Sequence, residues 1–178
     1  MDDLKLVIPD NNDKKSALLM LDEIKVVDAG LPWQYSGLAN LEEATSYEDW
    51  VKEKANEKNG IDLRDGYVPC TTLFLKRMSD NKVCGSISIR HELNDFLFKF
   101  GGHIGYSITP SERGKCYGKL QLKMGLEIAK SLGIKNCLIT ADVENIVSNK
   151  TIISEGGILE NTVMWNNDPL NRYWINLK

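Results

Sequence analysis

Histidine is scarce in this chain, and its cysteines are few and far apart. The two histidines are His91 and His103. The four cysteines share no close spacing: Cys70, Cys84, Cys116 and Cys137. A zinc site usually draws on closely spaced pairs of these two residue types. The sequence therefore predicts no metal site, and its cysteines are typical of free, buried thiols.

Long apolar runs and an excess of basic residues are also missing. No run approaches the roughly 20 apolar residues that a membrane-spanning helix needs. The chain begins Met1-Asp2-Asp3, without the cationic start and apolar core of a signal peptide, so we expect a cytoplasmic location and no membrane partner. The formal net charge of −3 makes nucleic acid an unexpected partner.

The composition fits one ordinary globular domain. Hydrophobic residues make up 42% of the 178 positions and charged residues 26%, both typical of soluble globular proteins. No internal repeat or low-complexity stretch divides the chain. We therefore expect a single domain over residues 1–178.

Apolar periodicity predicts alternating strands and helices. A short strand over 4–8, a helix over 13–28 and a helix over 46–59 come first, with an irregular segment over 29–44. The later predicted elements are strands 71–76, 82–90 and 103–109, helix 119–132, strand 136–141, helix 146–155, and strands 157–165 and 173–177. The expected fold class is α/β, a mixed and mostly antiparallel sheet with helices on both faces, in the order β-α-α-β-β-β-α-β-α-β-β.

A basic, glycine-bearing loop lies between a predicted strand and a predicted helix, over 110–119. Such a loop offers backbone N–H groups and the positive end of a helix dipole to an anion. Arg113, Lys115 and Lys119 add positive charge, which favours a phosphate-bearing ligand. The loop matches neither the P-loop nor the dinucleotide fingerprint. It follows Arg-x-x-Gly-x-Gly instead, with Cys116 at the first of the two pattern glycines.

This loop resembles that of the GNAT superfamily, acyltransferases that use acetyl-coenzyme A. The resemblance runs from about residue 83 to 157 and is similar to a bacterial branch whose members are mostly uncharacterised. It implies that backbone amides wrap the coenzyme A pyrophosphate. Glycine at position 116 would let the backbone approach the ligand, so the Cys116 side chain is expected either to crowd the pyrophosphate or to shift the loop.

A second segment supports the resemblance. Asn145 and Ser148 match an Asn-x-x-Ser/Ala pattern that opens a helix in the family. The family's Asn bonds the pantetheine arm, which enters between two splayed strands; the alternative for Asn145 is a plain helix N-cap. The cofactor-binding residues implied by the resemblance are Tyr106, Ser107, Ile108, Arg113, Gly114, Lys115, Cys116, Tyr117, Gly118, Lys119, Asn145 and Ser148.

Direct acyl transfer needs donors for the oxyanion, a proton for the leaving thiolate and a base for the amine. By resemblance, backbone groups over 105–108 are the oxyanion candidates. Many family members carry a Tyr proton donor where this chain has Ile152, so Ser148, Tyr173 or water are the substitutes. The base candidates are Glu92, His103 and His91, because imidazole and carboxylate both accept protons near neutral pH.

The acceptor pocket in the family is flanked by the first two helices and their link. The aromatic candidates for shaping it are Trp33, Tyr35, Trp50, Phe96 and Phe98. The alternative for each is core packing, which is the preferred interpretation for Trp50 on its predicted helix. The leading interpretation is an N-acetyltransferase that moves an acetyl group from acetyl-coenzyme A to a primary amine of a small molecule or peptide. One alternative is a non-catalytic acyl-coenzyme A sensor or partner module on the same fold, and another is a globular protein without a coenzyme site. Dimers are common in the family, so a homodimer is one expected assembly.

Overall fold

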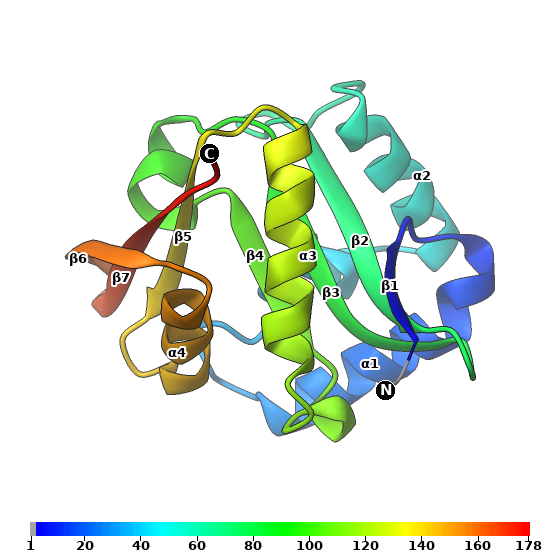
Figure 1. Cartoon of the computed structure of the whole chain (residues 1–178). Helices are drawn as coiled ribbons and strands as arrows, with labels where there is room; N and C mark the ends of the chain where they lie inside the picture. Colours follow the sequence, from blue (N-terminus) through cyan, green and yellow to red (C-terminus); the bar gives the residue numbers. More distant parts are fainter. Residues whose placement is uncertain (1–2) are drawn as a thin grey trace.

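The structure, a computed structural model, describes residues 3–178. Four α-helices and seven strands of this part of the chain follow the predicted order, which confirms the predicted class (Figure 1). Their bounds are β1 Leu4–Val7, α1 Lys14–Val27, α2 Tyr47–Lys58, β2 Cys70–Arg77, β3 Lys82–Arg90, β4 Ile104–Ile108, α3 Tyr117–Ser131, β5 Asn136–Asp142, α4 Ile146–Ser154, β6 Ile158–Trp165 and β7 Asp168–Asn176. None of the helices over 3–178 is long and apolar enough to cross a bilayer.

The strands form two antiparallel sheets. One has the order β1-β2-β3-β4 and the other β5-β7-β6. The strands β4 and β5 are therefore edge strands that face each other where the two sheets meet, and helix α3 connects them. The predicted mostly antiparallel arrangement is confirmed, and the division into two sheets creates the gap in which the candidate site lies.

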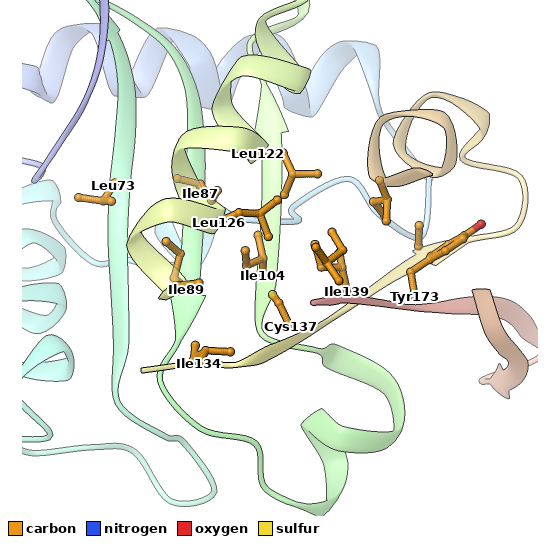
Figure 2. Close-up of a cluster of buried hydrophobic side chains, with 14 residues drawn as sticks. Leu73, Ile87, Ile89, Ile104, Leu122, Leu126, Ile134, Cys137, Ile139 and Tyr173 are labelled. Carbon is orange, nitrogen blue, oxygen red and sulfur yellow. The ribbon is translucent and has the colours of Figure 1, made fainter. Parts of the chain in front are cut away.

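Alternation along the strands places helices on both faces of the first sheet. Leu73 packs with α3 residues in one cluster, while its neighbour Phe74 packs with α1 and α2 in another. Figure 1 shows α3 crossing β3 and β4, with α1 and α2 on the opposite side. In the first cluster, Ile87 and Ile89 of β3 meet Leu126 of α3 (Figure 2). These two apolar layers hold the sheet rigidly between the helices.

Local sequence explains where the first two helices lie. Helix α1 buries four apolar side chains at helical spacing: Ala17, Met20, Leu21 and Ile24. Helix α2 begins after Ser46, whose hydroxyl accepts the Asp49 backbone N–H at 3.1 Å, as its Ser-x-x-acid pattern indicates. Trp50 of α2 is fully buried and donates to the Ala39 carbonyl at 2.9 Å. The ring of Trp50 therefore belongs to the core, which is the preferred interpretation for an aromatic residue on this helix.

The segment between α1 and α2 lies directly on β3 and β4. The Gly37 carbonyl accepts hydrogen bonds from Ser86 Oγ at 2.7 Å and Ser88 Oγ at 3.1 Å. A Cβ on Gly37 would come within 2.5 Å of the Tyr106 Cα and 2.8 Å of the Gly105 carbonyl oxygen. Only a glycine permits this approach, so the segment forms a fixed wall over the face of β4.

The last hairpin is tighter than the sequence predicts. Strand β7 begins at Asp168, five residues before the predicted start at Tyr173. Asn166 and Asn167 both have positive φ, at 48° and 70°, and form a two-residue turn. Asparagine tolerates this left-handed conformation, and such turns match the twist of paired strands. Pro169 lies outside the predicted strands 157–165 and 173–177, but in the structure it pairs with Met164 in the ladder.

Candidate active site

The loop after β4 brings several backbone amides to the start of α3. Gly114 has φ +78° and lies in open space, and Cys116 at the helix N-cap has φ +61°. The Cys116 side chain makes no capping hydrogen bond to the helix. The first-turn N–H groups of an α-helix, here including those of Gly118 and Lys119, have no partner inside the helix. The loop and helix start therefore offer donors to an anion, as the sequence predicts.

The basic side chains of this loop are paired with carboxylates of the chain itself. Arg113 forms a two-pronged ion pair with the buried Asp28, with one N–O distance of 2.8 Å, and its Nε donates to the Ile108 carbonyl at 3.1 Å. Lys119 lies 3.7 Å from Glu155. These pairs fix the shape of the loop and leave less of its charge for a ligand.

Glu112 is the buried carboxylate beneath the loop. Lys115 and Lys82 each lie 2.7 Å from it, and Arg77 lies 2.8 Å away. Burial alone would raise its pKa, but the hydrogen bonds from Arg77, Lys115 and Lys82 together outweigh burial and lower the pKa to about 2. Glu112 is therefore a charged anchor that ties the loop to β2 and β3.

Cys116 occupies a position that favours glycine for its backbone as well as for space. Its side chain is exposed, and its φ of +61° falls in the left-handed region that costs an ordinary residue about 1–2 kcal/mol. The family glycine would adopt this conformation freely. The sequence shows the departure from the pattern, and the structure adds its backbone cost.

The gap between β4 and β5 is closed at one end by His103. Its backbone N–H donates to the Leu138 carbonyl at 2.7 Å, and its Nδ1 accepts the Leu138 N–H at 2.9 Å. Burial lowers the pKa of His103, which keeps the imidazole neutral and able to accept. Past this point the two sheets separate, so His103 holds them together at the end of the gap.

In the described part of the chain, the edge of β4 that faces the gap has no partner strand. The Thr109 N–H bonds to Cys84 of β3, and alternate residues of an antiparallel strand face the same partner. The backbone groups of Tyr106 and Ile108 therefore face away from β3, toward the gap. The Ile108 carbonyl accepts from Arg113 there, which agrees with this assignment. Of the predicted oxyanion donors, the N–H groups of Tyr106 and Ile108 point the right way.

The predicted Asn145 and Ser148 lie on the far side of the gap. Asn145 caps α4, with its Oδ1 accepting the Ser148 N–H at 3.1 Å, so the plain capping interpretation holds for this oxygen. The Ser148 hydroxyl lies 3.1 Å from the Tyr106 hydroxyl. Burial raises the pKa of Tyr106, which keeps its phenol protonated. Two residues that the sequence placed in the site therefore meet across the gap.

A single cavity of about 960 Å³ connects these features. It runs from the start of α3, along β4 and α4, to the α1–α2 segment and the β6–β7 hairpin. Eleven of the twelve predicted cofactor residues line it: Tyr106, Ser107, Ile108, Arg113, Gly114, Cys116, Tyr117, Gly118, Lys119, Asn145 and Ser148. Lys115 does not line it, because its side chain turns to Glu112.

The predicted catalytic residues fare less well, since only Ser148 lines the cavity. Glu92 is exposed beyond the end of β3, and His103 is held by Leu138. His91 contacts Thr71 instead, at 2.8 Å. Tyr173 is buried and donates to Asn149 Oδ1 at 2.6 Å. The structure does not bring these four side chains to the cavity wall.

The cavity is also lined by charged and aromatic residues for which the sequence predicts no role in a site. Asp142 at the end of β5 and Asp168 at the start of β7 both belong to its wall. Burial first, and then the charge of Asp168, raise the pKa of Asp142. Phe100 and Trp165 pack at 4.7 Å between ring centroids beside them. In the sequence, Asp142 could have been identified as a site candidate because it is a carboxylate at the end of a predicted strand. Its neighbour Asp168 could not, because it lies 26 residues further along the chain.

Arg90 also lines the cavity, at the end of β3. Trp33 lines it as predicted, and Tyr35 and Phe96 line a second, smaller cavity of about 280 Å³. Phe98 lies on the other side of this region, where it packs against Trp174 and Arg172. Over residues 3–178 there is no group of three or more His, Cys, Asp or Glu arranged to hold a metal ion.

Several solved structures that share this fold are acetyltransferases. The microcin C7 self-immunity acetyltransferase MccE, solved with acetyl-coenzyme A and AMP, is 20% identical, with a TM-score of 0.68 over 99% of this chain and 93% of that chain. A spermidine/spermine N-acetyltransferase from Vibrio cholerae is 14% identical, with a TM-score of 0.61 over 98% and 94%.

A protein assigned to the GNAT acetyltransferase family, from Bordetella pertussis, is 14% identical, with a TM-score of 0.65 over 96% and 94%. No family model matches the sequence, and no curated protein does so either. The likenesses cover nearly the whole chain, and they confirm that it has the GNAT fold that the sequence resembles.

Proposed function

We propose that this chain is an N-acetyltransferase that uses acetyl-coenzyme A and acts by direct attack of a primary amine. One observation carries the proposal: a single cavity joins an anion-binding helix start, an open strand edge and a wall made by the α1–α2 segment. Acetyl-coenzyme A has three parts in the same order: a phosphate end for the helix start, an amide-bearing arm for the strand edge, and a reactive thioester beside the α1–α2 segment. The GNAT fold of the chain agrees with it.

The residues present fit the coenzyme at its phosphate end. Gly114 is open to the cavity and the start of α3 has no side-chain cap, so backbone N–H groups are left for the pyrophosphate. The open edge of β4 would take the amides of the pantetheine arm as a neighbouring strand would. Acetyl-coenzyme A supplies an acetyl group activated as a thioester.

The chain's own groups would stabilise charge in the transfer step. The Tyr106 or Ile108 N–H, on the open edge, would donate to the carbonyl oxygen as negative charge develops there. The Tyr106 hydroxyl, in contact with Ser148, is the proposed proton donor to the departing sulfur. This pair takes the role that neither Ile152 nor Tyr173 can serve, because both side chains are buried in the core.

Asp142 and Asp168 are the proposed base for the acceptor amine. Both carboxylates line the cavity, and the raised pKa of Asp142 makes it a better proton acceptor than an ordinary surface Asp. A cationic amine would also be attracted to this pair before it loses its proton. Glu92 and His103 are replaced in this role, because neither lines the cavity.

The direct test is calorimetric titration with acetyl-coenzyme A, followed by thiol release with a broad panel of amines. Micromolar binding and amine-dependent thiol release are expected. No binding and no thiol release at saturating acetyl-coenzyme A would overturn the proposal. Binding without turnover would favour the non-catalytic sensor instead.

A pair of tyrosine variants tests the mechanism. We expect Tyr106→Phe to lower kcat about 10- to 100-fold while acetyl-coenzyme A affinity changes little, because only proton transfer is lost. The matched control Tyr173→Phe removes a buried hydroxyl outside the cavity and should leave kcat unchanged. Equal effects in the two variants would remove Tyr106 from the mechanism.

A further inference from the structure

Arg90 occupies the boundary between the two cavities. It is the last residue of β3, and it lines both the 960 Å³ cavity and the 280 Å³ cavity beside it. Ser36 and Gly37 of the α1–α2 segment also line both. Arg90 therefore lies where the reactive end of the larger cavity meets a side pocket.

Arg90 is also the one arginine without an acidic partner in the described part of the chain. All four other arginines form ion pairs with carboxylates: Arg64, Arg77, Arg113 and Arg172. No Asp or Glu over residues 3–178 lies within 4.0 Å of the Arg90 guanidinium. One nitrogen, Nη1, donates to the carbonyls of Gly101 at 3.2 Å and Gly102 at 3.0 Å. Carbonyls satisfy these donors but do not neutralise the charge.

Burial makes this charge costly. Burial lowers the pKa of Arg90, and the only groups that oppose the shift are the Cys70 thiol and the Tyr67 hydroxyl, neither of which is a carboxylate. A partly buried cation without an anion is a position that most proteins avoid. The lysine of the smaller cavity, Lys54, does not share this feature, because Glu57 holds it at 2.6 Å. An anion from outside the chain would complete the Arg90 site.

The shape of the guanidinium indicates which anion. Its planar fork matches the two oxygens of a carboxylate better than a lysine ammonium would. At the same time, Asp142 and Asp168 line the larger cavity, and neither forms an ion pair with a cation over residues 3–178. The cavity wall thus holds unpaired charge of both signs, as a ligand with both an ammonium and a carboxylate would require.

We propose that Arg90 binds the carboxylate of the acceptor and that the acceptor is a free amino acid. This inference rests on the proposed acetyltransferase function and narrows its acceptor class. In this arrangement Arg90 holds the carboxylate at the mouth of the side pocket, which accommodates the substituent. The amine is left in the larger cavity, near the two aspartates. Arg90 sets specificity and does not take part in proton transfer.

The test compares each of several amino acids with its own carboxamide as acceptor. Replacing the carboxylate by an amide keeps the amine and the size but removes the negative charge. We expect kcat/KM to be about 10- to 100-fold higher for the acids than for the amides, as for a charge-assisted pair. Dipeptides serve as a third set of acceptors, because their carboxylate lies farther from the amine. Their kcat/KM should be as low as that of the amides.

Variants then assign the preference to one residue. Arg90→Gln keeps a donor for the Gly101 and Gly102 carbonyls but loses the charge, and it should abolish the acid preference through KM. Its affinity for acetyl-coenzyme A should not change. The matched control Arg172→Gln alters a buried arginine that pairs with Glu160 outside the cavity, and it should keep the preference. Arg90→Lys, which restores charge without the fork, should recover part of it.

A binding experiment separates this inference from the enzyme proposal. N-acetylamino acids and their carboxamides are titrated against the wild-type protein with coenzyme A present, and ligand signals are followed by NMR. Preferential binding of the acids supports Arg90 recognition even if no acceptor is turned over. Equal binding or no binding of both sets, or amides that are acetylated as well as acids, would overturn the inference while leaving acetyl transfer itself intact.

Discussion

The two ends of the cavity treat charge in opposite ways. At the end near the start of α3, the proposed coenzyme end, Arg113 and Lys115 form ion pairs with the buried carboxylates Asp28 and Glu112. At the acceptor end, Arg90 has no carboxylate partner among residues 3–178, and Asp142 has no cation partner there. Internal ion pairs give the first end its shape, so in the proposed function the coenzyme phosphates are bound mainly by backbone N–H groups. At the second end the charges are unpaired, so in that proposal side chains recognise the acceptor.

The sharpest contrast between the two ends is in backbone packing. Gly37 at the acceptor end and Gly114 at the coenzyme end have φ of +76° and +78°. A Cβ would lie 2.5 Å from a backbone atom at Gly37 but meets nothing within 4 Å at Gly114. We expect Gly37→Ala to lower the free energy of unfolding by about 2–5 kcal/mol, and Gly114→Ala by about 1 kcal/mol. Urea unfolding measures both, and equal losses would contradict the contrast.

Breaking the internal pairing of the coenzyme end is the next largest effect. The Glu112 pKa falls from 4.5 to about 2 on folding, so its ionised form stabilises the native state by about 3 kcal/mol. Because the folded pKa is depressed, this contribution is present above pH 4.5 and is lost as the pH falls toward 2. Glu112→Gln should lower the free energy of unfolding by about 2–3 kcal/mol at pH 7 and flatten its decline below pH 4.5. Urea unfolding from pH 7 to pH 2.5 checks this. If the free energy of unfolding of the variant declined below pH 4.5 as steeply as that of the wild type, the prediction would be refuted.

Removing the carboxylate partner of one loop cation should leave an unpaired charge at the coenzyme end, as Arg90 is at the acceptor end. In Asp28→Asn, Arg113 loses its carboxylate and becomes available to a phosphate. We expect acetyl-coenzyme A to bind about two- to tenfold more tightly by calorimetry, with a loss of about 1 kcal/mol in stability. Glu155→Gln, which frees the more distant Lys119, is the control and should have a smaller effect. Weaker binding in Asp28→Asn would mean that the pair positions Arg113 for the ligand.

The smallest expected effect concerns Cys116. Cys116→Gly removes the side chain beside the helix start and relieves the strain of a left-handed backbone conformation. It also raises the conformational entropy of the unfolded chain, which opposes the gain in stability. Coenzyme A binding should tighten by about 1 kcal/mol or less, and the free energy of unfolding should change by no more than about 1 kcal/mol. Titration with coenzyme A alone is the measurement. Unchanged affinity would show that the loop accommodates Cys116.

The sequence predicts the elements of this fold better than it predicts the partners of its charges. The loop after β4 leads from a strand into helix α3 because local patterns determine both elements, and Asn145 caps α4 as its position indicates. The Arg113–Asp28 pair joins residues 85 apart in the chain, so no local pattern contains it. The sequence predicts that the Arg113 charge faces a phosphate. In the folded chain Asp28 already pairs with that charge, which the sequence alone does not show.

Apart from Ser148, the predicted catalytic side chains do not line the cavity, for a similar reason. His103 has the residue type of a base, but its imidazole accepts the Leu138 N–H from another sheet. Tyr173 has a hydroxyl, but its strand lies between β5 and β6 and directs it to Asn149. Residue type gives a side chain's chemistry, whereas the direction it faces depends on strand pairings far away in sequence. Nothing in the sequence distinguishes Arg90 from another arginine at a strand end, because its position between two cavities depends on segments distant in the chain.

The open edge of β4 has a consequence for the protein's behaviour in solution. An unpaired strand edge is the feature through which proteins join into fibrils, and here it lies inside a cavity rather than on the surface. Burial of this kind protects the edge from other chains but leaves it reachable by a slender ligand. Amide hydrogens of the Tyr106 and Ile108 edge should exchange readily with solvent in the free protein and slowly once an amide-bearing arm lies along it. The same edge that would aggregate in the open thus becomes a reporter of ligand binding.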